Sequence, residues 1–121
     1  MKKVLIGLTL LSLGLASCGK EKKSEIKVLS PEQGKTYTSP LPLNVKISNN
    51  NNPIHDIEIK VYQKNNPDLV IFDYDNHVEV NEYEVKDSLF VNVSSPTQFV
   101  LEIEVGEEVE THKNVEFTIN P

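Results

Sequence analysis

The chain has 121 residues with 18 acidic residues, 12 lysines and no arginine, so its net charge is −6. An acidic chain without a basic patch excludes ordinary binding to the phosphate backbone of nucleic acids. The length corresponds to one domain at most, and 38% hydrophobic residues with 5 Gly and 7 Pro are typical of a globular chain.

The N-terminal segment has the composition of a secretory signal. Lys2 and Lys3 precede an uncharged apolar run over residues 4–15. As a helix, this run would be about 18 Å long, whereas the hydrocarbon core of a membrane is about 30 Å thick. Residues 1–17 are therefore predicted to be a signal peptide and not a membrane span.

The apolar run ends in Leu15-Ala16-Ser17-Cys18, and these four residues resemble a bacterial lipobox, the recognition site of the lipoprotein signal peptidase. The resemblance implies that the Cys18 thiol receives diacylglycerol and that cleavage occurs just before it. The alternative is a plain secretory signal with an incidental cysteine nearby. Cys18 is the only cysteine in the chain, so no disulfide framework is expected.

Residues 18–24 are predicted to be the lipidated cysteine and a short tether. The lysines of this tether either contact anionic headgroups or belong to a solvated linker. By analogy with the sorting rule of enterobacterial lipoproteins, Gly19 in place of Asp implies transport to an outer membrane. The expected location is the bacterial cell envelope, with the lipid as the membrane contact.

Residues 25–121 alternate between apolar and polar side chains, which predicts strands and no helix. Asp75-Asn76 is interpreted as the turn of a hairpin, residues 63–67 as a loop, and Asn81-Glu82 as a bulge or break where the alternation changes phase. Strands are expected within residues 26–28, 43–47, 57–61, 69–74, 77–80, 83–85, 89–93, 99–105 and 109–119.

With residues 77–85 taken as one bulged strand, these ranges give seven or eight short strands and predict an all-β, two-layer antiparallel sandwich. The acids of the last hairpin are expected on its outward face, opposite the apolar side chains of the core. These acids are Glu102, Glu104, Glu110 and Glu116.

Residues 26–31 with Gly34, followed by residues 41–47, resemble the opening of bacterial immunoglobulin-like domains, and residues 115–119 resemble their closing strand. The resemblance implies an immunoglobulin-like β-sandwich over residues 25–121. The chain lacks the paired cysteines and buried Trp of antibody-type domains, so aliphatic packing has to hold the core.

Metal-binding motifs are weak in the sequence. His55, His77 and His112 show no local pairing, so they are interpreted as surface histidines, and no metal site or cofactor is predicted. The acids around His77 superficially resemble a calcium loop, but Val78 replaces the glycine such a loop requires. These residues are Asp73, Asp75, Asn76, His77 and Glu79.

No catalytic motif is present either. The chain has no Gly-x-Ser-x-Gly motif, and Cys18 would be consumed by the lipid. Two acids flanking a sugar stay conceivable, but small strand-only domains more often bind than catalyse. The protein is therefore predicted not to be an enzyme.

Two weaker features have alternative interpretations. Asp87-Ser88-Leu89 resembles the acceptor of a bacterial O-glycosylation system, which would place a glycan on Ser88; otherwise it is a turn before a strand. The tyrosines either form an aromatic platform for sugars or peptides, or pack within the sandwich. They are Tyr37, Tyr62, Tyr74 and Tyr83.

Three functional hypotheses follow. The first is a non-catalytic, lipid-anchored binding module for a protein or glycan partner, which would use loops at one end or an exposed sheet edge. The second is a periplasmic ligand- or metal-handling accessory protein that uses one of the histidines. The third is an envelope hydrolase with a paired-carboxylate site.

Overall fold

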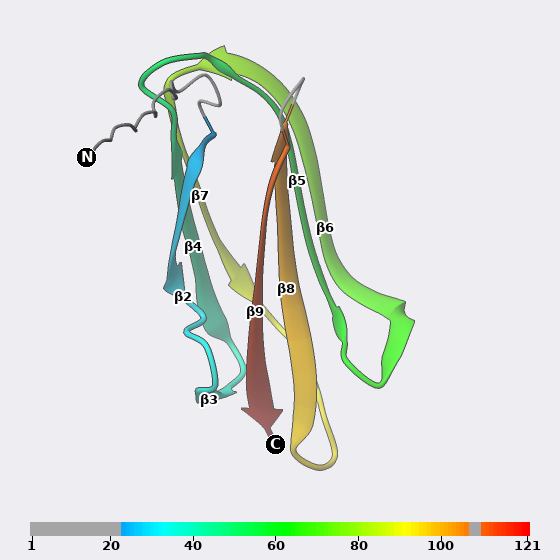
Figure 1. Cartoon of the computed structure of the whole chain (residues 1–121). Coiled ribbons are helices and arrows are strands. Elements are labelled where there is room, and N and C mark those ends of the chain that lie inside the picture. The colour runs from blue at the N-terminus through cyan, green and yellow to red at the C-terminus, as the bar shows by residue number, and fades with distance from the viewer. Residues whose placement is uncertain (1–22, 107–109) are drawn as a thin grey trace, which may run out of the picture.

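A computed structural model describes residues 23–106 and 110–121, and within these ranges every regular element is a β-strand (Figure 1). The predicted signal peptide, the lipobox residues Leu15 to Cys18 and most of the tether lie outside the described residues. The strands are β2 (Glu25–Ser30), β3 (Thr36–Thr38), β4 (Leu41–Ser48), β5 (Ile54–Gln63), β6 (Asn66–Val80), β7 (Glu82–Leu89), β8 (Thr97–Gly106) and β9 (Thr111–Asn120).

The strands form two sheets that face each other (Figure 1). One sheet has three strands in the order β2-β4-β7, and the other has five in the order β3-β9-β8-β5-β6. Because every described element is a strand and the strands form two sheets, the all-β, two-layer prediction is confirmed. All strand pairs are antiparallel except one.

The exception corrects the prediction of a purely antiparallel sandwich. β3 pairs in parallel with β9, with Tyr37 beside Ile119. The chain leaves β2 in the three-stranded sheet and continues onward to the edge of the other sheet. Gly34 permits this crossing because its φ is +77°, a conformation that side chains with a Cβ disfavour. The Gly34 N–H donates to the Glu116 carbonyl at 2.7 Å, which fixes the crossing segment to β9.

The core lies between the sheets and is almost wholly aliphatic. Leu43 and Val45 of β4 are buried, as are Ile59 of β5 and Leu101 of the central strand β8. Phe99 and Phe117 stack with ring centroids 6.0 Å apart at one end. Glu102 and Glu104 alternate with buried residues and stay partly exposed, which confirms the outward face predicted for β8.

Two predicted elements are wrong. Asp75 and Asn76 do not form a turn: they lie inside the continuous strand β6, which pairs with β5 around a turn at residues 64–65. Residues 90–96 contain no strand, although Val91 and Val93 pack against the core. The Val91 N–H donates to Ser39 Oγ at 2.8 Å and not to a neighbouring strand.

Of the bulge or break predicted at Asn81-Glu82, the structure shows a break, since β6 ends at Val80 and β7 begins at Glu82. Asn81 between them donates from its side chain to the Asn49 carbonyl at 2.8 Å. The Asn49 side chain in turn accepts the N–H groups of Asn51 and Asn52 at 3.0 and 2.9 Å. These amides join the β4–β5 loop to the β6–β7 connection at one end of the sandwich.

No helix long and apolar enough to cross a membrane occurs in the described part of the chain.

Candidate functional site

The longest strand, β6, lies at the edge of the five-stranded sheet, so one side of its backbone pairs with no other described strand (Figure 1). The other edges are short or carry a lysine: β3 has three residues, while β2 and β7 contain Lys27 and Lys86. Lysine on an edge strand opposes pairing with other chains. β6 contains no lysine; Pro67 and four acids are the residues that oppose pairing there, and it is the longest edge among the described strands.

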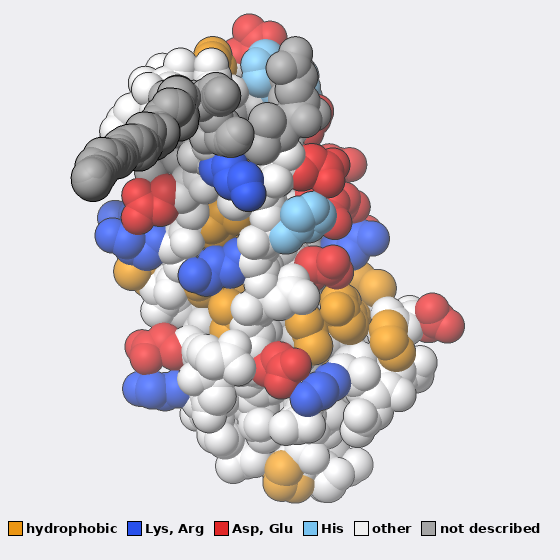
Figure 2. Space-filling model, viewed as in Figure 1, with side chains coloured by type: hydrophobic (Ala, Val, Ile, Leu, Met, Phe, Trp, Pro, Cys, Tyr) orange, Lys and Arg blue, Asp and Glu red, His pale blue; other side chains and the backbone are white. Residues whose placement is uncertain are grey.

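Exposed apolar side chains accompany this edge. Leu69 and Val70 are 49% and 42% exposed. Val70 lies opposite Tyr62 of β5, and Tyr62 lies opposite Val100 of β8, which gives an apolar row across the outer face of the sheet. Figure 2 shows hydrophobic side chains gathered on this side of the molecule.

The edge strand is also acidic. Asp73, Asp75 and Glu79 are exposed, and Asp68 lies near the start of the strand. The register places Asp75 opposite Glu58 of β5, and Glu58 opposite Glu104 of β8. Acidic side chains consequently follow one another along this side, beyond the apolar group (Figure 2).

Two of the three histidines come together at the far end of β6. His77 lies opposite Asp56, and its Nδ1 is 2.8 Å from Asp56 Oδ1. Its Nε2 is 3.9 Å from Glu79 Oε2. The His55 ring lies against the His77 ring with centroids 6.0 Å apart. Both histidines lie in paired strands, and nothing in their sequence spacing predicted this contact.

A local irregularity of the β5–β6 ladder produces this arrangement. Ile54 pairs with Val80 and Asp56 with His77, so a single residue of β5, His55, lies opposite two of β6. Such a bulge redirects side chains. His55 and Asp56 are consecutive, yet both reach His77.

His112 lies elsewhere, in the last strand as predicted. Its Nδ1 is 3.5 Å from Glu104, and its Nε2 is 3.2 Å from Glu110. This histidine therefore has two acidic neighbours, and the described residues place no second histidine beside it.

The tyrosines do not form a common platform. The Tyr74 and Tyr83 hydroxyls are 2.5 Å apart, and Asn76 donates to both. Because Tyr74 is in β6 and Tyr83 in β7, this hydrogen bond joins the edges of the two sheets. Tyr37 accepts the Glu32 N–H at 2.7 Å and packs edge-on against Phe117.

The pKa values of two tyrosines are raised. Burial is the main cause for Tyr62, and Glu102 and Glu116 add to it because a negative charge opposes formation of the phenolate. For Tyr74 the pKa is raised first by burial and then by the hydrogen bond with Tyr83. Both phenols therefore stay protonated at neutral pH.

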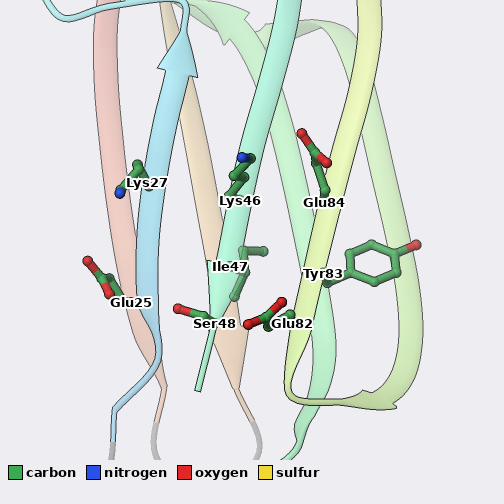
Figure 3. Close-up of a pocket in the computed structure, with 8 residues that line it drawn as sticks. All are labelled: Glu25, Lys27, Lys46, Ile47, Ser48, Glu82, Tyr83 and Glu84. Atoms are coloured by element: carbon green, nitrogen blue, oxygen red, sulfur yellow. The ribbon is translucent and has the colours of Figure 1, made fainter. Parts of the chain in front are cut away.

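A second surface lies on the outer face of the three-stranded sheet (Figure 3). It surrounds an open hollow of about 430 Å³. Three acids from β2 and β7 alternate there with two lysines from β2 and β4, so charges of both signs are mixed. These residues are Glu25, Glu82, Glu84, Lys27 and Lys46.

The predicted modification sites stand as follows. Ser88 is exposed on the edge strand β7, so its side chain is accessible. The Ser88 N–H donates to the Asp87 carboxylate at 2.8 Å. Its predicted glycan stays a prediction. Cys18 lies outside the described residues.

No protein-family model matches the chain, and no curated protein matches it. Among solved structures, a crystal structure of an engineered protein is similar to it, with a TM-score of 0.54 over 82% of this chain and 11% identity. The chain spans only 20% of that protein's length. This likeness supports the β-fold alone.

Proposed function

We propose that the protein is a lipid-anchored lipoprotein of the bacterial cell envelope, in the outer membrane, whose residues 25–121 form a non-catalytic binding module. The anchor rests on Leu15-Ala16-Ser17-Cys18 and the short apolar run before it. Two or three acyl chains on Cys18 would hold the protein stably at a membrane, whereas one would be marginal.

We further propose that the sandwich is of the immunoglobulin-like type. Its support is the topology, in which the N-terminal strands β2 and β3 are divided between the two sheets. The parallel pairing of β3 with β9 brings the beginning and end of the domain together.

The observation that carries the binding proposal is the open edge of β6. On the side away from β5, β6 pairs with no other described strand, and its backbone there offers hydrogen bonds to an extended segment of another protein, which would add a strand to the sheet. Exposed Leu69 and Val70 would contribute apolar contact. A protein segment is favoured over a glycan because the hydroxyls of Tyr37, Tyr74 and Tyr83 already make hydrogen bonds within the protein.

Charge selects the kind of segment. β6 carries four acids and no lysine. Pairing with the β6 strand of a second copy would bring like charges together, which is destabilising. A basic extended segment would instead place lysine or arginine beside Asp73 and Asp75.

The experiment is an NMR titration of the isotope-labelled full chain in detergent with a ten-residue peptide of alternating valine and lysine. We expect saturable shifts of β6 backbone amides that weaken as salt is raised, since exposed charges are screened. A peptide of alternating valine and glutamate serves as the ligand control.

A charge-reversed protein tests the location. Asp73→Lys with Asp75→Lys is expected to abolish binding of the basic peptide, whereas Glu82→Lys with Asp87→Lys on the β7 edge is expected to leave it unchanged. Equal binding of the two peptides, shifts that map to β7, or concentration-dependent pairing of β6 with itself would refute the proposal.

A further inference from the structure

We propose that His55, His77 and Glu79 form a binding site for a divalent transition-metal ion of the zinc type, and that Asp56 orients His77 within it. This inference does not depend on the lipid anchor or on the strand-binding proposal. It rests on side chains that two strands bring together.

The first argument is convergence. One ligand atom from each of His55, His77 and Glu79 lies within 4.8 Å of the other two. In a tetrahedral zinc site with bonds of about 2.0–2.2 Å, the ligand atoms are roughly 3.4 Å apart. Closure therefore requires movements of about 1 Å, which side-chain rotation can supply because His77 and Glu79 are exposed and His55 is only half-buried.

The second argument is the hydrogen bond between His77 and Asp56. An ionised carboxylate can only accept, so the His77 Nδ1–H donates to Asp56 Oδ1 across 2.8 Å. A neutral imidazole protonated at Nδ1 carries its lone pair on Nε2, the atom that a metal would use. Nε2 is the nitrogen near Glu79. A carboxylate that fixes the tautomer of a metal-binding histidine in this way is a recurring feature of zinc sites.

The third argument is position. His55 and Asp56 reach His77 through the bulge in the β5–β6 ladder, and His77 and Glu79 are two residues apart on the same strand. The site therefore stands on paired strands and not on a loop. Asp75 precedes His77 by two residues, and Glu58 of β5 lies opposite Asp75. Further negative charge therefore surrounds the site and attracts cations.

The ligand set selects the class of ion. Two imidazoles and one carboxylate suit zinc and copper, whereas calcium and magnesium prefer oxygen ligands throughout. Three protein ligands leave a fourth position for water or for a group from a partner.

The test is isothermal titration calorimetry of the full chain in detergent with zinc chloride. Cys18→Ser is introduced in every sample because it removes the only thiol. We expect one zinc ion per chain, and we expect the ¹⁵N signals of the His55 and His77 rings to shift while those of His112 stay unchanged.

Variants locate the ligands. His55→Ala and His77→Ala should each abolish the one-to-one binding, and Asp56→Asn should weaken it by about 10- to 100-fold, as loss of an orienting partner does. His112→Ala is the matched control, because it removes an exposed histidine that also lies beside two carboxylates, and it should leave the affinity unchanged.

Circular dichroism of each variant checks that the sandwich stays folded. The proposal is overturned by any of three results: no heat of binding at millimolar zinc, full affinity in folded His77→Ala, or a loss in His112→Ala as large as that in His77→Ala.

Discussion

Replacement of Leu101 by alanine tests whether the central strand β8 is oriented as described. Leu101 is fully buried, and it pairs with Val61 of β5 on one side and Val115 of β9 on the other. All three side chains are buried between the two sheets. A cavity at this point has packed neighbours on both sides that cannot easily collapse into it.

The expected cost follows from this burial. Leucine-to-alanine substitutions in packed cores cost about 2–5 kcal/mol, because the transfer free energy of the lost atoms and the cavity add together. A domain of this size loses roughly 4–8 °C of melting temperature for each kcal/mol. We therefore expect the melting temperature to fall by at least about 8 °C. Leu101→Asp should prevent folding, since it would also bury an unpaired carboxylate.

The matched control is Glu102→Ala, one residue along the same strand. Glu102 is only half-buried and lies opposite Lys60 and Asn114, so its loss should change the free energy of unfolding by about 0.5 kcal/mol or less. Urea denaturation followed by circular dichroism measures both variants. If the two alanine variants are destabilised equally, the assignment of inward and outward faces in β8 is wrong.

Further expectations concern the polar contacts that join the sheets. Tyr74→Phe should lower the free energy of unfolding by about 1 kcal/mol in urea denaturation, because it removes the hydrogen bond to Tyr83; an unchanged value would contradict the inter-sheet role. Because the pKa of Tyr74 is raised in the folded state, protonated Tyr74 contributes stability that is fully present below pH 10 and is lost as the pH rises through the folded-state pKa. Tyr74→Phe should therefore reduce the loss of stability between neutral pH and pH 11. Asn49→Ala should cost about 1–3 kcal/mol, since Asn49 is buried and its side chain accepts two backbone N–H groups, whereas Asn50→Ala, an exposed neighbour, should be neutral in the same assay.

The sequence predicted β5, β8 and β9 well because one face of each strand is buried and the other is partly exposed. Ile57, Ile59 and Val61 alternate with polar residues, and this period of two is a direct consequence of strand geometry. The same rule failed for residues 89–93. Val91 and Val93 cover the core without pairing with a strand, so their alternation reports burial alone.

The error in β6 has a different cause. Asp75-Asn76 has the local preference of a turn, but Asn76 pairs with Ile57 and Asp75 with Glu58, and this pairing overrides the preference. Cross-strand pairing of this kind is a long-range interaction that local sequence does not contain.

The histidine contact was beyond prediction for the same reason. A regular hairpin closed by residues 64–65 would place Asp56 opposite Asp73. Register shifts in the β5–β6 ladder place it opposite His77 instead. A correct turn assignment alone would therefore still have missed the contact between His55 and His77. The acidic, lysine-free composition of residues 66–80, in contrast, was visible in the sequence.

Mass spectrometry of the mature N-terminus, isolated from the native envelope, tests the proposed envelope function most directly. The proposed anchor on Cys18 requires a chain that begins at Cys18 and carries diacylglycerol on its sulfur, and Cys18→Ser is expected to block both the modification and the cleavage. A mature chain with an unmodified thiol at Cys18, or one that begins at any other residue, would contradict it.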